Sequence, residues 1–401
     1  MFEPSFVVDN LYARADILVP VKDKWDIIEV KSSTSVKPEH IHDVSFQKYV
    51  YEKAGLKIRN CYLMHLNNEY VRKGDIDVKK LFVKEDITAD VEGVSEGIIE
   101  RISEMFDIIN DVNCPDIPIH EGCFKPYNCP VEEECWGFLP ENSVFELYRG
   151  GKKCFELLDN GIHHLKDIPS SCKLNDKQKI QCSCGKTGKI HIDRKEIKKF
   201  LDKLKYPLYF MDFETYNTAV PLYDGLKPYS QICFQFSLHV QNDKIEHYEF
   251  LASNGDPRKE FIASLKEVLG SEGSIIVYNE SFEKKRLEEL GELFPEYSDW
   301  VKSVNKRIVD LIVPFRNFGY YNLKQKGKCG LKQVLPAITS KGYDELLINQ
   351  GGDASQQYFY AVHGGASEAE IKKIRKALLE YCKLDTEGMV WIVDELRGIV
   401  E

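Results

Sequence analysis

The sequence lacks several features that would place the protein in a familiar class. Its 401 residues contain no apolar run of the ~18 residues that a membrane-spanning helix needs. Residues Met1 to Pro4 lack the basic and apolar regions of a secretory signal, so we expect a cytoplasmic protein with no membrane partner. Positive charge does not predominate either, since 54 Lys and Arg are outnumbered by 64 Asp and Glu, which gives a net charge of −10. This excludes a uniformly basic coat for nucleic acid but leaves room for local basic stretches.

What remains is an ordinary globular composition, with 43% hydrophobic and 29% charged residues. The length predicts two or three domains, each with its own core. In a reducing compartment the twelve cysteines are expected to be free thiols or metal ligands, because disulfides rarely persist there.

Acidic residues mark three separate segments of the C-terminal half. Asp212 and Glu214 end an apolar stretch, and the side-chain period of a strand predicts both on one face. Glu283 follows a short predicted strand, where a helix should begin. Tyr381 and Asp385 share one face of a predicted helix at spacing four. Such converging carboxylates suit a pair of hard cations, Mg²⁺ or Mn²⁺.

These three segments resemble the motifs of the DEDDy branch of the DnaQ-like 3′–5′ exonucleases. The resemblance rests on Asp-x-Glu from Asp212, Asn-x-x-Phe-Glu from Asn279, and Tyr-x-x-x-Asp from Tyr381. It implies an RNase H-like fold, two metals held by Asp212, Glu214, Glu283 and Asp385, and a tyrosine, Tyr381, that orients the attacking water. One position departs from the family, which has Asp where this chain has the longer Glu283. Asp310 is expected either near this site or as the cap of a turn.

A second acidic group is predicted near the N-terminus. Residues 15–19 and 25–31 read as two strands joined at Lys22 to Lys24. If the hairpin centres between Lys22 and Asp23, Asp16 lies opposite Glu29, with Lys31 on the same face. A helix is predicted over residues 44–51, with Gln47 and Tyr51 on one face.

This arrangement resembles the PD-(D/E)XK nuclease core, and Gln47 with Tyr51 matches a motif of RecB-like nucleases, including CRISPR-associated ones. The resemblance implies that Asp16 and Glu29 bind a metal, that Lys31 stabilises charge or orients water, and that Gln47 and Tyr51 contact nucleic acid. The helix and strand that precede this core in the family have no counterpart before Asp16. We therefore expect a truncated, weak or inactive module.

Cysteines are evenly spaced at the C-terminal end of this module. Cys123-x5-Cys129-x5-Cys135, with prolines between the thiols and a tryptophan after the last, resembles three of the four ligands of the [4Fe–4S] cluster in iron–sulfur RecB-like nucleases. A cluster needs four thiolates, and Cys114 is the candidate for the fourth. A Zn²⁺ site on the same thiols is the alternative.

Two stretches are locally basic. Residues 173–205 contain eleven Lys and Arg against four acids, and residues 302–332 contain eight against Asp310 alone. The second stretch mixes charge with rings, as a single-strand path does. Its expected nucleic-acid contacts are Lys324, Lys326, Lys328 and Lys332, and its expected stacking rings are Phe315, Phe318, Tyr320 and Tyr321.

The sequence thus predicts an α/β protein with three parts: a truncated PD-(D/E)XK-like module over 1–140 with the cysteines at its end, a helical connector over 141–205, and an RNase H-like exonuclease domain with a mixed sheet over 206–401. The whole order resembles a bacterial family that fuses these two nuclease modules. The expected function is metal-dependent hydrolysis of single-stranded or frayed DNA or RNA. The alternative is a nucleic-acid-binding subunit of a repair or defence complex, with both centres degenerate.

Overall fold

The apolar stretch that ends in Asp212 and Glu214 forms strand β8 (Leu208–Tyr216) in a computed structural model that describes residues 1–401. Alternate side chains of this strand, Tyr209, Met211 and Phe213, are buried in one hydrophobic cluster. Because strand side chains alternate, Asp212 and Glu214 face the opposite side of the sheet. The predicted placement of both acids on one face is therefore confirmed.

Strand β8 is the centre of a five-stranded mixed sheet with the order β10-β9-β8-β11-β12. It pairs antiparallel with β9, which pairs antiparallel with β10, whereas β11 runs parallel to both β8 and β12. The other strands are β9 (Ile232–Gln241), β10 (Ile245–Leu251), β11 (Ser274–Val277) and β12 (Ile308–Asp310). Three antiparallel strands are thus followed by helices that alternate with short strands, and the predicted mixed sheet is confirmed.

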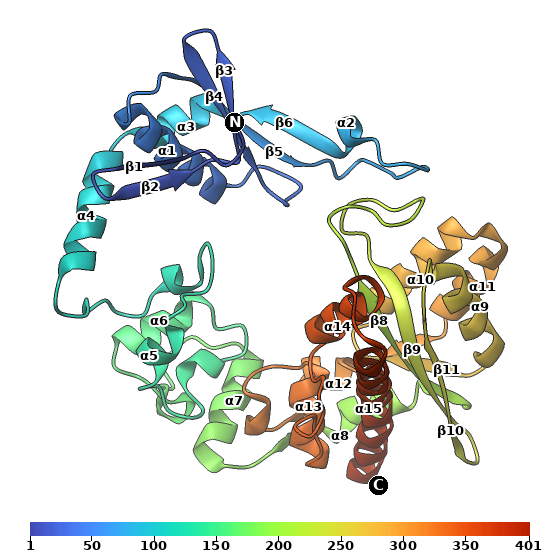
Figure 1. Ribbon diagram of the computed structural model, residues 1–401. Helices are drawn as coiled ribbons and strands as arrows, with labels where there is room; N and C mark the ends of the chain where they lie inside the picture. The colour runs from blue at the N-terminus through green and yellow to red at the C-terminus, as the bar shows by residue number, and fades with distance from the viewer. The chain divides into compact units, whose positions relative to one another are not determined.

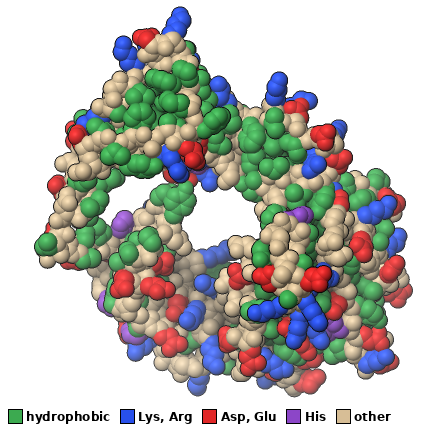
Figure 2. Space-filling view, viewed as in Figure 1, with side chains coloured by type: hydrophobic (Ala, Val, Ile, Leu, Met, Phe, Trp, Pro, Cys, Tyr) green, Lys and Arg blue, Asp and Glu red, His purple; other side chains and the backbone are tan.

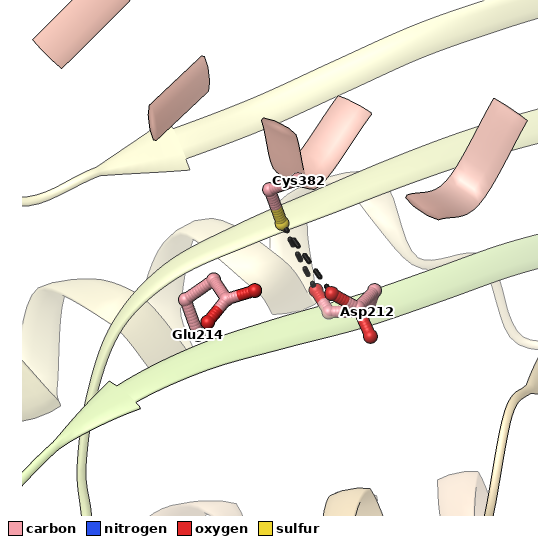
Figure 3. Close-up of side chains that lie close together, drawn as sticks. All are labelled: Asp212, Glu214 and Cys382. Carbon is pink, nitrogen blue, oxygen red and sulfur yellow. Dashed lines mark hydrogen bonds between the residues drawn. The ribbon is translucent and has the colours of Figure 1, made fainter. Parts of the chain in front are cut away.

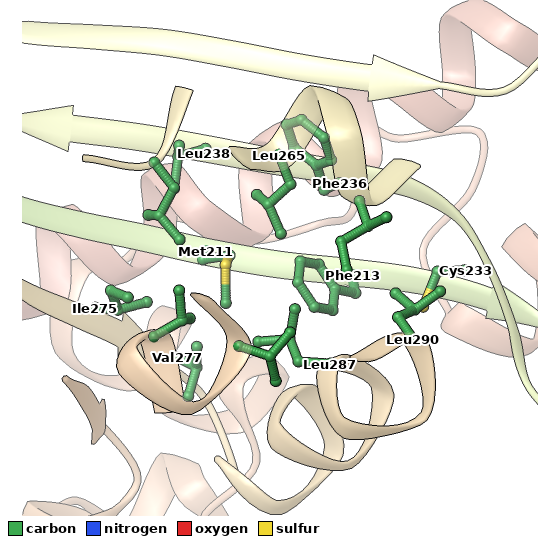
Figure 4. Close-up of a cluster of buried hydrophobic side chains, with 14 of the residues drawn as sticks. Met211, Phe213, Cys233, Phe236, Leu238, Leu265, Ile275, Val277, Leu287 and Leu290 are labelled. Atoms are coloured by element: carbon green, nitrogen blue, oxygen red, sulfur yellow. The ribbon is translucent and has the colours of Figure 1, made fainter. Parts of the chain in front are cut away.

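Helices cover both faces of this sheet. The hydrophobic cluster on one face joins β8 and β9 to α9 (Arg258–Val268), α10 (Ser281–Leu293) and α11 (Ser298–Asn305), as Figure 4 shows for part of it. The long helix α15 (Glu368–Val400) packs on β8 and β9 from the other side (Figure 1). The acids of β8 therefore lie beneath α15, away from the apolar cluster.

The chain folds as two compact units, and this sheet belongs to the second, which comprises Ile119–Tyr216 and Gln231–Glu401. The rest of the second unit is mainly helical, apart from the short antiparallel pair β7 and β13. Its elements are α5 (Glu132–Trp136), α6 (Lys152–Asp159), α7 (Asp176–Thr187), β7 (His191–Ile192), α8 (Arg194–Leu201), α12 (Val313–Arg316), β13 (Tyr320–Tyr321), α13 (Leu331–Thr339) and α14 (Gly351–His363).

The first unit comprises Met1–Pro118 and Asn217–Ser230. Its four-stranded mixed sheet has the order β3-β4-β5-β6, and α1 connects the parallel strands β4 and β5. A separate hairpin of β1 and β2 precedes it. The elements are β1 (Ser5–Val8), β2 (Leu11–Arg14), β3 (Ile17–Val21), β4 (Lys24–Val30), α1 (Pro38–Lys53), β5 (Ile58–Leu66), α2 (Val78–Leu81), β6 (Phe82–Asp86), α3 (Thr88–Ser95) and α4 (Ile98–Asn110).

The predicted register of the N-terminal hairpin is confirmed. Strands β3 and β4 pair Ile17 with Ile28 and Val21 with Lys24, so the hairpin centres between Lys22 and Asp23. Lys22 has a φ of 57°, which a tight turn between two adjacent strands requires.

Part of the first unit comes from the middle of the chain. Residues Asn217–Ser230, which join β8 to β9, pack against the connection that follows β5. Arg72 donates to the backbone carbonyls of Pro221 and Leu222 at 2.9 and 2.6 Å, and its own backbone pairs with Gly225 and Leu226 at 2.9 and 3.0 Å. Contacts between positions about 150 residues apart in sequence were not predicted.

Both units are thus α/β structures built on mixed sheets, as the sequence predicts. None of the helices combines the length and the apolar composition needed to cross a membrane.

The entry into β11 depends on Gly273, which has a φ of 86°. A Cβ atom on this residue would lie 2.0 Å from the backbone carbonyl oxygen of Pro207. We expect Gly273→Ala to lower the free energy of unfolding by about 2–4 kcal/mol, because backbone strain and a steric clash add. Gly188→Ala is the control, since Gly188 has a φ of 67° and open space around it, and should cost about 1–2 kcal/mol. Urea unfolding monitored by circular dichroism measures both, and equal losses would show that the contact with Pro207 does not matter.

Candidate functional site

The acids predicted from three separate segments converge in the second unit. Asp212 and Glu214 approach Cys382 so that one ligand atom of each lies within 4.8 Å of the others (Figure 3). Burial raises the pKa of Asp212 well above its usual range, and the carboxylates of Asp385, Glu214 and Glu283 raise it further. Electrostatic coupling of this kind requires short distances. The structure therefore groups Asp212 and Glu214 with Cys382 and places Asp385 and Glu283 near enough to act on the charge of Asp212.

Local backbone structure explains how Glu283 reaches the centre. After β11 the chain turns at Asn279, whose φ of 75° is a conformation that Asn adopts more readily than most residues. The backbone N–H of Asn279 donates to Asp310 at 2.9 Å, as does that of Ile312 at 3.1 Å. Helix α10 then begins, and Glu283 in its first turn is only 2% exposed. Asp310 caps this turn and lies close enough to Glu283 to affect its pKa.

Helix α15 supplies the remaining predicted residues. It begins with a capping box, in which Glu370 accepts from the backbone N–H of Ser367 at 2.8 Å. Tyr381 and Asp385 are both buried, one turn apart on the face that packs on the sheet. Burial and the neighbouring acids raise the pKa of Tyr381, so its phenol keeps its proton.

Two residues that the sequence did not indicate, and one that it assigned to another role, complete the surroundings of Asp385 and Asp212. The hydroxyl of Tyr343 donates to Asp385 at 2.5 Å, and the thiol of Cys382 donates to Asp212 at 3.6 Å. Cys382 follows Tyr381 directly, so its place beside the motif was a usable signal, whereas nothing in the sequence marks Tyr343. Lys332, predicted to contact nucleic acid, lies 4.8 Å above the ring of Tyr381. Its charge lowers the pKa values of Asp385 and Glu214, so it belongs to the acidic centre.

A buried polar network holds α15 on the sheet next to Asp385. The hydroxyl of Thr386 is hydrogen-bonded to Ser237 at 2.7 Å and to the Nδ1 atom of His239 at 2.8 Å. Ser237 is also bonded to His247 at 2.9 Å. Burial lowers the pKa of both histidines to about 4, so they are neutral at neutral pH. This network fixes the rotation of the helix that carries Asp385.

The donor set of this centre fits divalent cations. The Oε2 atom of Glu283 is buried and has no hydrogen-bond partner. Burial, together with Asp310, raises the pKa of Glu283 to about 8, and burial raises that of Asp385 to about 6 despite the opposing effects of Tyr343 and Lys332. Carboxylates kept from water and short of positive partners are stabilised by a cation, which offsets their repulsion. Asp212, Glu214, Glu283 and Asp385 are the residues that would hold it.

The predicted site of the first unit is also assembled. Asp16, just before β3, accepts from the backbone N–H of Val30 at 2.7 Å. Glu29 is 6% exposed and accepts from Lys31 at 2.8 Å. Lys31 donates equally to Asp43 at 2.7 Å, and Asp43 was not predicted. Asp43 lies one turn before Gln47 in α1, so helical spacing would have identified it.

Gln47 and Tyr51 have partners inside the unit. The amide of Gln47 donates to Glu29 at 3.0 Å and to Asp43 at 3.2 Å. The hydroxyl of Tyr51 accepts from the backbone N–H of Ala15 at 2.7 Å and donates to the carbonyl of Pro4 at 2.6 Å. Tyr51 is completely buried, so the prediction that it contacts nucleic acid is not supported. Its hydroxyl group instead stabilises the backbone just before β3.

The predicted cysteine cluster is not gathered at one point. The backbone N–H of Cys129 donates to the carbonyl of Cys123 at 2.8 Å, but Cys123, Cys129 and Cys135 form no group of three ligand atoms within 4.8 Å. A closed zinc site would hold its sulfurs about 4 Å apart. Cys114 belongs to the first unit and the other three to the second. The iron–sulfur site stays a prediction.

The predicted nucleic-acid track is only partly at the surface. Lys324, Lys326 and Lys328 are exposed. The stacking prediction is wrong, because these four rings are at most 3% exposed and pack in the interior: Phe315, Phe318, Tyr320 and Tyr321. Figure 2 shows Lys and Arg side chains gathered where Figure 1 places α15, and the exposed lysines there include Lys372, Lys376 and Lys383.

Comparisons with known proteins match part of the chain. Residues 209–330 match the model of a domain of unknown function, DUF2779. That segment contains Asp212, Glu214 and Glu283 but ends before Tyr381.

Three bacterial relatives cover about half of this chain. An uncharacterized protein of Mycoplasma genitalium, MG366, is 28% identical over 51% of this chain and 34% of its own length. Its homolog in Mycoplasma pneumoniae is 27% identical over 49% of this chain and 33% of its own length. The uncharacterized protein UU173 of Ureaplasma parvum is 25% identical over 50% of this chain and 32% of its own length. The chain thus spans about a third of the length of these relatives. Among solved structures, the family B DNA polymerase of Pyrobaculum calidifontis is 15% identical over 46% of this chain and 24% of its own, with a TM-score of 0.32.

The raised pKa of Glu283 predicts how the free energy of unfolding changes with pH. Its pKa is about 8 in the folded chain and about 4.5 when unfolded, so the native state binds the proton more tightly between these values. Glu283 therefore contributes stability at low pH that is lost as pH rises toward 8. Without divalent metal, the stability of the parent minus that of Glu283→Gln should fall from pH 5 to pH 8, by at most about 1.4 kcal/mol per pH unit. Denaturant unfolding in EDTA measures it.

The control is Glu289→Gln on the same helix, because Glu289 is 44% exposed and bonded to Arg286. Its stability should run parallel to that of the parent over this pH range. If Glu283→Gln also runs parallel, Glu283 titrates normally and is not in a repulsive acidic centre.

Proposed function

We propose that residues 206–401 act as a nuclease that depends on Mg²⁺ or Mn²⁺, and that the reaction is 3′–5′ exonucleolytic hydrolysis of phosphodiester bonds. The observation that carries this proposal is the convergence of Asp212, Glu214, Glu283 and Asp385 beside Tyr381. The resemblance to DEDDy exonucleases assigns the same roles to the same residues. We propose the RNase H-like fold for this domain on the same resemblance.

The chain's own residues have distinct tasks in this reaction. The four carboxylates hold divalent ions, which when bound activate water and stabilise the leaving oxygen. Tyr381 keeps its phenolic proton, so it orients the attacking water by a hydrogen bond and does not act as a base. Tyr343 and Lys332 hold Asp385 in its ionised form. Cys382 donates to Asp212 and holds that carboxylate in place.

The substrate class follows from the reaction and from the surface. A single-stranded or frayed 3′ end is the form that a recessed centre of this kind can accept. The exposed lysines Lys324, Lys326 and Lys328 are the proposed phosphate contacts. Both DNA and RNA carry the phosphodiester that the site would hydrolyse, so both are candidates.

One observation favours the alternative of a nucleic-acid-binding subunit without catalysis. Glu283 stands where the family has Asp, and a pKa of about 8 leaves much of it protonated at neutral pH in the absence of metal. A protonated carboxyl group is a poor ligand, so the second metal would bind weakly. Such a chain would bind strands, as part of a repair or defence complex, and leave them intact.

For the N-terminal part we propose a RecB-like, PD-(D/E)XK-type module whose metal ligands are Asp16 and Glu29, followed by the iron–sulfur ligands Cys123, Cys129 and Cys135. The support is the confirmed register of the hairpin and the contact of Glu29 with Lys31. Anaerobically purified protein with broad visible absorbance and stoichiometric iron is expected. Colourless protein with stoichiometric zinc would favour the Zn²⁺ alternative.

The central test is digestion of 5′-labelled single strands of DNA and RNA by the full chain, with Mg²⁺, with Mn²⁺ and with EDTA. We expect metal-dependent shortening in single-nucleotide steps from the 3′ end, and resistance of strands with a blocked 3′ end. Asp212→Asn should slow digestion by roughly a thousandfold, about 4 kcal/mol of barrier. Strand binding that persists without any digestion by the parent would favour the binding-subunit alternative.

Two substitutions of Glu283 distinguish the effect of side-chain length on activity from the effect of charge. Glu283→Asp should retain activity within about tenfold, or about 1.4 kcal/mol, because a water molecule can absorb the difference in length. Glu283→Gln should lose considerably more because it removes the charge. Glu289→Gln on the same helix is the matched control and should digest like the parent. If Glu283→Gln also digests like the parent while Asp212→Asn is inactive, Glu283 is not part of the metal site.

A further inference from the structure

Four side chains of the first unit close a ring of hydrogen bonds. Lys31 donates to the Oε1 atom of Glu29 at 2.8 Å and to the Oδ2 atom of Asp43 at 2.7 Å. Gln47 donates to the other oxygen of each acid, to Oε2 of Glu29 at 3.0 Å and to Oδ1 of Asp43 at 3.2 Å. Two carboxylates from different elements, β4 and α1, therefore converge on a single cationic atom.

This ring differs from an ordinary ion pair in the same sheet. Asp26 of β4 uses both of its oxygens on one guanidinium, with bonds of 2.9 and 2.5 Å to Arg59, and no second acid takes part. In the ring, one ammonium faces two acids, and Asp16 is close enough to raise the pKa of Glu29. The negative charge of three carboxylates exceeds the single positive charge of the Lys31 ammonium, so the group is left with net negative charge.

The amide of Gln47 supplies an independent indication of a missing ligand. Gln47 is 4% exposed, and its Oε1 atom is buried without any hydrogen-bond donor. The unpartnered oxygen belongs to the amide group whose nitrogen bridges Glu29 and Asp43. A buried acceptor left without a donor costs free energy. A cation with its bound water would provide both the charge and the donor, because Mg²⁺ usually keeps several waters.

We propose that Asp43 is a third acid of this site, and that Mg²⁺ or Mn²⁺ binds between Glu29 and Asp43 in exchange for the ammonium of Lys31. The exchange is open to solvent, since the side chains of Lys31 and Asp43 are 27% and 39% exposed. The flexible stem of lysine lets the ammonium swing outward. Gln47 keeps its bonds during the exchange because it uses the opposite oxygen of each carboxylate.

The test measures Mn²⁺ binding to the full chain by electron paramagnetic resonance. Asp212→Asn and Asp385→Asn are present throughout, so that the second unit's acids do not contribute. One Mn²⁺ per chain is expected to remain bound. Asp43→Asn should weaken its Kd by about tenfold or more, whereas Lys31→Met should tighten it by about tenfold, because the competing ammonium is gone.

Asp26→Asn is the matched control, a buried acid of β4 outside the ring, and should leave the Kd unchanged. Circular dichroism checks that each variant folds. If Asp43→Asn does not fold, Lys31→Met still tests the proposal. Weaker binding in Lys31→Met would overturn the exchange, and an unchanged Kd in Asp43→Asn would remove Asp43 from the site. Absence of bound Mn²⁺ in the background protein would overturn the whole proposal. The readout is metal binding, so the outcome is independent of the nuclease activity proposed for the second unit.

Discussion

Repulsion between buried carboxylates is the constraint on which the second unit depends. Glu214 and Asp385 are buried and Asp212 is partly buried, and each has a raised pKa because desolvation disfavours its charged form. Such a group is not stable by itself, because desolvation and like charge both oppose it. The surrounding scaffold must be rigid enough to hold it. The apolar cluster beneath β8 and the hydrogen-bond network around Thr386 provide that rigidity from opposite sides of the sheet.

The two units handle acidic charge in different ways. In the first unit an ammonium stands between Glu29 and Asp43, so the charges are partly balanced within the chain. In the second unit Lys332 acts on the acids from above the ring of Tyr381, and Glu283 has a buried oxygen without a partner. The second centre therefore gains more from a bound cation, while the first must release a lysine to accept one. The two units differ in this way because Lys31 contacts its carboxylates directly, whereas Lys332 acts on its acids from over the ring of Tyr381.

Residue type alone was a poor guide to what lies at the surface. Phe315, Phe318 and Tyr321 stand in a basic stretch, yet they fill the interior while lysines a few residues away are exposed. Large rings contribute more by burial than by exposure, and a stretch that alternates between core and surface presents only its charges to solvent. Lys332 ends the same stretch, and from α13 its ammonium lies over the ring of Tyr381 and acts on the acidic centre.

The sequence by itself determined the elements whose signals are local. Alternation along β8, the pairing centre between Lys22 and Asp23, and the helical spacing of Tyr381 and Asp385 all depend on periods of two or 3.6 residues, which are visible in one stretch of chain. Only the tertiary structure decided which distant side chains join these elements. Tyr343 reaches Asp385 across 42 positions, and Arg72 holds a segment about 150 residues away. Such contacts depend on how whole elements pack, and packing leaves no periodic trace in the sequence.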